Sequence, residues 1–186
     1  LLFDTSQRLT QELETAPRIV LVGRVKSGKS TLLNALVGAP VAQTAALEAT
    51  GVVTVYQYGA PDRAEAVMDN GATVAVRTRR GETAELPAPA DQIAFVNRWM
   101  PSGAIAQHTL IDTPGLSTLT AERATTTEQA LLRGHEQTKR AAVDADAAVF
   151  LFDTAPRRDE IEFLNRLGFG PLNTLGLLAR ADSFGE

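Results

Sequence analysis

Apolar residues along this chain fall into two patterns. Continuous, β-branched apolar runs predict strands buried in a sheet, and apolar residues three or four positions apart predict helices between them. The expected strands are residues 18–22, 52–58, 108–112, 147–152 and 174–179, and the expected helices are residues 31–36, 91–99, 128–141 and 157–167. Strands that alternate with helices imply an α/β fold with a mostly parallel central sheet, which binds its ligands at the carboxyl ends of the strands.

The first residues follow a pattern of their own. Apolar residues recur at helical spacing over residues 2–14, and Pro17 ends the pattern. This helix either packs on the domain that follows it or belongs to a helical bundle completed by other segments. We therefore expect an N-terminal amphipathic helix in residues 1–16 and a single domain in residues 17–186.

A β-hairpin is expected in the middle of the chain. Residues 65–68 and 73–76 are short strand-like segments joined at Asn70-Gly71, a dipeptide typical of tight hairpin turns. The small and polar residues of both segments indicate an exposed position near the edge of the sheet.

The segment with the clearest chemistry begins where the first predicted strand ends. Residues 23–30 match G-x-x-x-x-G-K-S and lie between a predicted strand and a predicted helix, the context of a phosphate-binding P-loop. In such a loop the backbone N–H groups point inward and the helix N-terminus adds positive charge, so a nucleoside triphosphate can bind. Lys29 would reach the β- and γ-phosphates, and the Ser30 hydroxyl would ligate Mg²⁺. The loop residues expected to contact the nucleotide are Gly23, Val25, Lys26, Ser27, Gly28, Lys29, Ser30 and Thr31.

A second motif, D-T-P-G, ends the strand predicted before it. Asp112 in this motif can hold Mg²⁺ through a water, and the N–H of Gly115 can meet the γ-phosphate. A threonine between the two motifs is needed as a further Mg²⁺ ligand, and we expect Thr50 to supply it. Thr44 and Thr54 are the competing candidates, although Thr54 falls inside a predicted strand, where side chains are fixed by the pleat.

A third motif would determine which nucleotide base the site binds. Ala179-Arg180-Ala181-Asp182 follows the last predicted strand, where GTPases carry an N/T-K-x-D element. Asp182 would accept two hydrogen bonds from guanine, a donor pair that adenine lacks. Arg180 can lie along the base plane as a lysine would, whereas Ala179 cannot make the loop-bracing hydrogen bond of the usual Asn or Thr. The alternative is a surface aspartate after a strand.

Together these motifs resemble the GTPase domain of bacterial dynamin-like proteins, in particular the isoniazid-inducible dynamin-like proteins of mycobacteria and their actinobacterial relatives. The strings that carry the resemblance are V-G-R-V-K-S-G-K-S-T-L-L-N-A-L-V-G at residues 22–38, E-A-T-G-V-V-T-V-Y-Q-Y-G at residues 48–59, I-D-T-P-G at residues 111–115 and A-R-A-D at residues 179–182. The resemblance implies the P-loop NTPase fold of Ras-like and dynamin GTPases, with the hairpin as an insertion that enlarges the segment between the switch regions.

The same resemblance implies GTP and GDP as ligands with Mg²⁺, GTP-dependent dimerisation with itself or with a related dynamin-like partner, and membrane remodelling. The N-terminal helix would then belong to a neck bundle. The domain is expected to be incomplete at its C-terminus, because the fifth GTPase element and its strand should follow Glu186. We expect a cytoplasmic protein, peripheral at the inner face of the cell membrane through parts outside this sequence.

Hydrolysis would need an unusual catalytic arrangement. Leu116 stands where Ras-like GTPases carry the glutamine that orients the attacking water, and leucine has no atom for that task. Backbone groups, Thr50 or a partner must hold the water. Lys26, the fourth residue of the loop, is the candidate for offsetting charge that develops between the β- and γ-phosphates. The alternative is a solvent-facing lysine with no such role.

Composition limits the remaining classes. The net charge of −4 gives no support to nucleic-acid binding, and the absence of cysteine excludes disulfides and thiolate metal sites. Two other functions stay open. One is an Era-type regulatory or ribosome-assembly GTPase switch, against which the acidic balance and the enlarged hairpin segment argue. The other is a weakly catalytic nucleotide-binding assembly partner, of which Leu116 and Ala179 would be signs.

Overall fold

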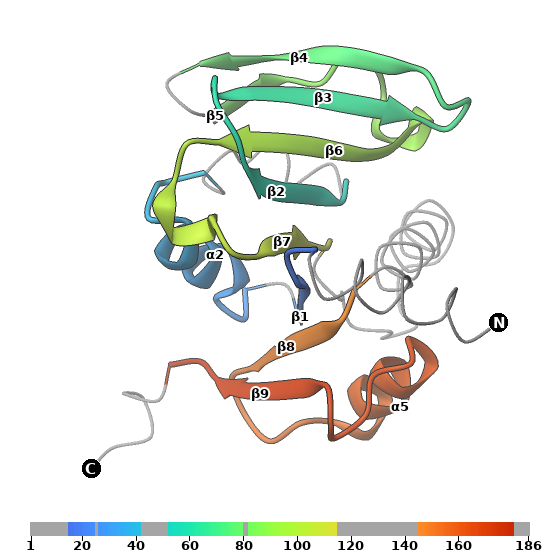
Figure 1. Ribbon diagram of the computed structural model, residues 1–186. Helices are drawn as coiled ribbons and strands as arrows, with labels where there is room; N and C mark the ends of the chain where they lie inside the picture. The colour runs from blue at the N-terminus through green and yellow to red at the C-terminus, as the bar shows by residue number, and fades with distance from the viewer. Residues whose placement is uncertain (1–14, 25, 42–51, 80–81, 115–144, 181–186) are drawn as a thin grey trace, which may run out of the picture.

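A single nine-stranded sheet organises the chain in the computed structural model (Figure 1). The structure describes residues 15–24, 26–41, 52–79, 82–114 and 145–180. Its strands are β1 (Arg18–Gly23), β2 (Thr54–Tyr58), β3 (Arg63–Met68), β4 (Thr73–Arg79), β5 (Glu82–Glu85), β6 (Ile93–Met100), β7 (Thr109–Asp112), β8 (Ala147–Phe152) and β9 (Thr174–Leu178). Its helices are α2 (Lys29–Val37) and α5 (Arg158–Arg166), with short 3-10 helices at Ala90–Gln92 and Gly103–Ile105.

The strand directions divide the sheet into two parts. The order is β5-β4-β3-β6-β2-β7-β1-β8-β9, and β7, β1, β8 and β9 form one continuous parallel group. The pairs β2–β7, β3–β6, β3–β4 and β4–β5 are antiparallel, and β2 and β6 are parallel to each other. The expected parallel arrangement therefore holds where the motifs lie, and the sheet as a whole is mixed.

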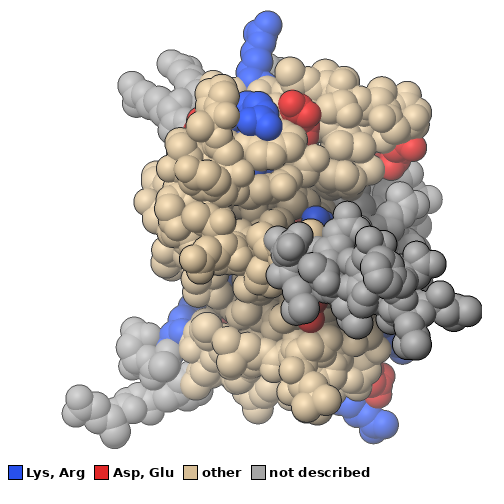
Figure 2. All heavy atoms as spheres, viewed as in Figure 1, with Lys and Arg blue, Asp and Glu red and all other residues tan. Residues whose placement is uncertain are grey.

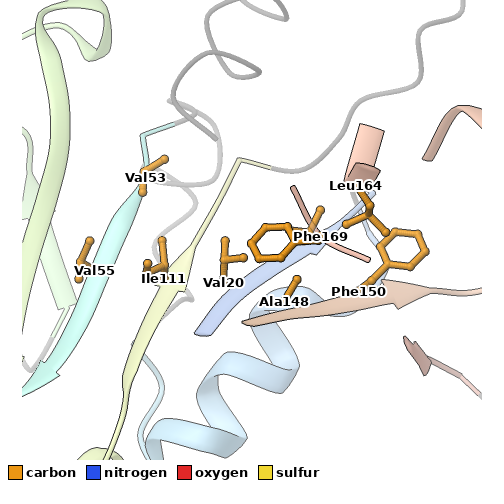
Figure 3. Close-up of a cluster of buried hydrophobic side chains, with 9 residues drawn as sticks. Val20, Val53, Val55, Ile111, Ala148, Phe150, Leu164 and Phe169 are labelled. Atoms are coloured by element: carbon orange, nitrogen blue, oxygen red, sulfur yellow. The ribbon is translucent and has the colours of Figure 1, made fainter. Parts of the chain in front are cut away.

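The two faces of the central strands carry different hydrophobic clusters. In β1, Val20 and Val22 belong to a cluster that includes Leu164 of α5, whereas Leu21 belongs to a cluster that includes Leu33 of α2. All three β1 side chains are fully buried. Alternation places successive side chains on opposite faces, so α2 and α5 pack on opposite sides of the sheet. Figure 3 shows the α5 cluster, in which Phe150 and Phe169 lie beside Leu164.

The predicted hairpin is present as β3 and β4. The two strands pair antiparallel, with Ala66 opposite Val74. Gly71 has φ of +83°, a left-handed conformation that glycine adopts without steric cost, and its N–H donates to the Met68 carbonyl at 2.8 Å. The pair lies in the outer part of the sheet, next to β5 (Figure 1). Its status as an insertion relative to other family members stays a prediction.

The helix predicted over residues 91–99 is wrong, since most of that segment forms β6. The sequence pattern misleads because Arg98 occupies an inward-facing position of the strand, between buried Val96 and Met100. Its side chain is 2% exposed and pairs with Asp62 at 2.6 Å. A charged residue inside the buried face hides the alternation that identifies a strand.

The strand β9 is present, but the expectation that it is buried is wrong. Leu175 and Leu178 are 62% and 42% exposed, and no described strand pairs with the outer edge of β9. An apolar run alone does not distinguish a central strand from an edge strand. The predicted helices over residues 1–16 and 128–141 lie almost wholly outside the described residues, so the division into an N-terminal helix and a domain stays a prediction.

Charges on the visible face of the molecule are sparse. In Figure 2, the blue and red atoms of the described residues lie mainly near the top and the lower edge, without a continuous basic patch among them. Within the described ranges, no helix is both long and apolar enough to cross a membrane.

Candidate nucleotide-binding site

The predicted loop lies at the carboxyl end of β1, between its two parallel neighbours. β7 ends at Asp112 on one side, and β8 continues along Gly23 on the other. α2 then begins at Lys29. The parallel group therefore brings the ends of its strands together at one edge, as expected for a ligand site in an α/β sheet.

Sterics and backbone conformation explain the two loop glycines. A Cβ on Gly23 would lie 2.6 Å from Ser27 Oγ and 2.9 Å from the Leu151 carbonyl oxygen, so only glycine fits this position. Gly28 has φ of +92° and precedes the first residue of α2, whose turn closes when the Leu32 N–H donates to the Gly28 carbonyl at 2.9 Å. The loop is thus folded back closely on β1 and β8.

Lys26 also has a left-handed backbone, with φ of +68°. Such a conformation costs a non-glycine residue roughly 1–2 kcal/mol. The side chain is exposed, and its ammonium forms no ion pair within the described part of the chain. Its carbonyl oxygen accepts a hydrogen bond from Arg180 at 3.2 Å. The hydrogen bond from Arg180 therefore holds the backbone of Lys26, whereas the Lys26 side chain is exposed to solvent.

Lys29 and Asp112 come from the two predicted phosphate and metal motifs and meet directly. Lys29 Nζ lies 2.6 Å from Asp112 Oδ1, and the lysine side chain is 8% exposed. A buried ammonium needs an anionic partner, and the carboxylate supplies one. Ser30 follows in the first turn of α2, so a hydroxyl and a carboxylate are available as the hard oxygen ligands that Mg²⁺ prefers.

Ala179 and Arg180, the first two residues of the A-R-A-D motif, lie next to the phosphate loop. Arg180 donates to the Lys26 carbonyl, and a Cβ on Gly28 would lie 3.7 Å from the Ala179 Cβ. Arg180 itself has φ of +56°, the left-handed region again. The segment after β9 is therefore in contact with the phosphate loop.

Four predicted site residues lie outside the described ranges, and their roles stay predictions. They are Val25, Thr50, Gly115 and Asp182. The competing threonine Thr54 is described: it lies in β2 opposite Asp112 and is 3% exposed.

Thr113 is a structural part of the site that the sequence did not single out. Its buried hydroxyl donates to the Leu21 carbonyl at 2.7 Å and so ties the D-T-P-G segment to β1. The only sequence signal for Thr113 was its position within the D-T-P-G motif.

Tyr56 is buried under α2. Burial, with a further contribution from the Asp112 charge, raises the pKa of its hydroxyl far above the usual range.

A second unpredicted contact joins the loop to α5. Arg24 Nε lies 3.5 Å from Glu160 Oε1, and both side chains are largely buried. Glu160 is the third residue of α5, and its Oε2 accepts the Arg157 N–H at 2.8 Å. Arg24 occupies an unspecified position of the G-x-x-x-x-G-K-S motif, and Glu160 belongs to no nucleotide-binding motif. Only the order R-x-D-E at the start of α5 therefore carried a signal, that of a helix cap.

Comparison with known proteins assigns the family. The Dynamin family profile matches residues 19–167. The chain is 34% identical over 188 residues to the isoniazid-induced protein IniC of Mycobacterium tuberculosis, a match that covers 96% of this chain and 37% of IniC. It is also 39% identical over 95 residues to the isoniazid-induced protein IniA of the same organism, covering 49% of this chain and 14% of IniA. The chain thus spans well under half of the length of these relatives.

A solved structure gives the same answer for the fold. It is described as an oligomerised bacterial dynamin pair that provides a mechanism for long-range sensing and tethering of membranes. The TM-score is 0.61 at 20% sequence identity, and the match covers 99% of this chain and 28% of the other. The resemblance drawn from the sequence motifs is confirmed: the chain belongs to the dynamin family, and its fold is that of a P-loop GTPase.

Proposed function

We propose that this chain binds GTP with Mg²⁺ at the loop between β1 and α2 and hydrolyses it to GDP and phosphate. The observation that carries the proposal is the convergence of three separate motifs: Lys29 contacts Asp112, and Arg180 contacts the Lys26 carbonyl. Lys29 and Asp112 lie 83 positions apart in the chain, and Lys26 and Arg180 lie 154 positions apart. A fold that brings them together supports a site for a single polyanionic ligand.

The proposed contact of each residue with phosphate, metal or base follows from its chemistry. The loop N–H groups and the N-terminus of α2 face a polyphosphate, and Lys29 neutralises its β- and γ-oxygens. Ser30, Asp112 and Thr50 would hold Mg²⁺, which neutralises the phosphates further when it is bound. The remaining proposed contacts are the Gly115 N–H on the γ-phosphate, and Arg180 and Asp182 on the guanine.

Hydrolysis needs positive charge near the bond that breaks, and Lys26 is the proposed source. Arg180 fixes the carbonyl of Lys26, so the residue keeps its place in the loop while its exposed side chain can reorient. A second GTPase domain facing this loop would order the ammonium next to the phosphates. Leu116 supplies no water-orienting atom, so backbone groups, Thr50 or the facing domain would have to hold the attacking water.

At the level of the whole protein, we propose a dynamin-like GTPase whose nucleotide-dependent dimerisation or assembly remodels membranes. The support is the family, together with a structural neighbour described as an oligomerised pair that senses and tethers membranes. The partner would be a second copy or a related dynamin-like chain. The protein would act in the cytoplasm, at the inner face of the cell membrane.

Two measurements on the full-length protein test this proposal. GTP turnover per molecule should rise with protein concentration, and liposomes of anionic lipid should sediment the protein more with a non-hydrolysable GTP analogue than with GDP. Turnover independent of concentration, with no liposome binding, would instead favour a regulatory switch. Nucleotide binding and assembly without measurable turnover would favour a weakly catalytic assembly partner.

A further inference from the structure

A nearly buried ion pair connects the second residue of the phosphate loop to α5. Arg24 Nε and Glu160 Oε1 lie 3.5 Å apart, and their side chains are 16% and 6% exposed. Charged groups this far from water are stable only when an opposite charge compensates them. None of the nucleotide contacts proposed above uses the side chain of either residue, so their pairing needs its own explanation.

The Glu160 end of the pair is fixed to a rigid element. The second carboxylate oxygen of Glu160 accepts the Arg157 N–H at 2.8 Å, which caps the N-terminus of α5. One turn later, Leu164 is 7% exposed and belongs to the hydrophobic cluster with Val20 and Val22 of β1. The carboxylate is therefore held in place by both the helix cap and the core.

The Arg24 end lies at the first turn of the loop. Its carbonyl accepts the Ser27 N–H at 3.1 Å, which closes the turn that leads to Gly28 and α2. α2 packs on one face of the sheet and α5 on the other. The loop is consequently held between two elements: it continues into α2 at one end and is bound to α5 through Arg24 at the other.

We infer that Glu160 is a positioning residue for nucleotide binding, which acts through Arg24 to keep the first turn of the loop in place. This inference rests on the proposed GTP site. With the pair intact, the turn closed by the Ser27 N–H and the Arg24 carbonyl keeps its position beside the proposed phosphate site. Without it, the guanidinium loses its compensating charge, and the turn that it belongs to becomes free to shift.

The test separates this role from the role of Glu160 in capping α5. In the full-length protein, Glu160→Gln keeps an oxygen that can accept the Arg157 N–H and removes only the charge. Arg24→Met removes the other partner and leaves the cap unchanged, so it remains informative if the Glu160 variant folds poorly. We expect each variant to release a fluorescent GDP analogue about tenfold faster and to raise KM for GTP by a similar factor, with a smaller change in kcat.

The double variant and a matched control complete the test. Because the two residues act as one unit, Arg24→Met combined with Glu160→Gln should release the analogue no faster than either single variant. Glu162→Gln lies on the same helix, in an exposed pair with Arg158, and should release it at the wild-type rate. Additive effects, or a fall in Tm with unchanged release and KM, would overturn the inference. Failure of the wild-type protein to bind the analogue would overturn the proposed GTP site as well.

Discussion

Lys26 is the residue at which backbone strain and proposed catalysis coincide. Its φ of +68° is one that glycine adopts freely, yet the chain carries a lysine with an exposed ammonium there. Strained residues persist where surrounding contacts fix them, and the Arg180 hydrogen bond to its carbonyl is such a contact. A side chain that is retained at an energetic cost supports a functional role for its ammonium.

Substitution of Lys26 should separate strain from catalysis. Lys26→Gly relieves the backbone and should stabilise the folded state by about 1 kcal/mol, which raises Tm by about 2–4 °C in a domain of this size. Lys26→Ala keeps the strained backbone and should leave Tm nearly unchanged. Both variants should lose the rise in GTP turnover with protein concentration. Normal concentration-dependent turnover in both would remove Lys26 from the mechanism, and exposed Arg158→Ala serves as the charge control.

The sequence motifs identified residues that the fold brings together, and the roles of these residues stay predictions. Lys29 and Asp112 were assigned from their motifs, and the structure places them in contact. Thr113 and Glu160 were not assigned, because their importance comes from partners far away in the chain: the Leu21 carbonyl and the Arg24 guanidinium. A motif identifies the groups that meet a ligand and leaves out the groups that hold the motif in place.

At the scale of elements, the contact between β7 and β1 continues past the end of the strands. β7 ends at Asp112, and the buried Thr113 hydroxyl then donates to Leu21 in β1 at 2.7 Å. Because this hydrogen bond anchors the residue that follows Asp112, we expect it to help hold the Asp112 carboxylate in its position facing Lys29.

Thr113→Val should test this dependence, because it keeps the shape of the side chain and removes the donor. The Leu21 carbonyl would lose a buried hydrogen bond, at a cost of about 1–3 kcal/mol. Thermal unfolding should show a Tm lower by several degrees, and the Mg²⁺ concentration required for half-maximal GTP binding should rise. Thr113→Ser retains the hydroxyl and should stay close to the wild-type protein in both measurements. Equal behaviour of the two variants would show that the hydroxyl is unimportant.

Element prediction failed where periodicity was masked or uninformative. β6 was expected as a helix because buried Arg98 interrupts its apolar face, and its partner Asp62 lies outside the strand. β9 was expected to be buried because its sequence is apolar throughout, whereas Leu175 is 62% exposed. The motif-bearing elements β1, α2 and β7 were predicted correctly, since apolar runs of clear periodicity lie directly beside the motifs.

At the scale of the whole molecule, the sheet combines a parallel half that carries the motifs with a region built around the β3–β4 hairpin. The fold class and the family were predicted from four sequence strings, and both are confirmed. Assembly and membrane action stay proposals, because this chain spans only 37% of the length of its relative IniC.

Base selectivity of nucleotide binding tests the central claim most directly. Calorimetric titration of the full-length protein in Mg²⁺ should give GTP binding about a hundredfold tighter than ATP binding, because the Asp182 carboxylate matches the guanine donor pair. Lys29→Ala should abolish the GTP signal, since the buried ammonium would no longer meet the phosphates. Equal affinity for GTP and ATP, or unchanged GTP binding by Lys29→Ala, would contradict the proposal that the loop after β1 is a GTP site.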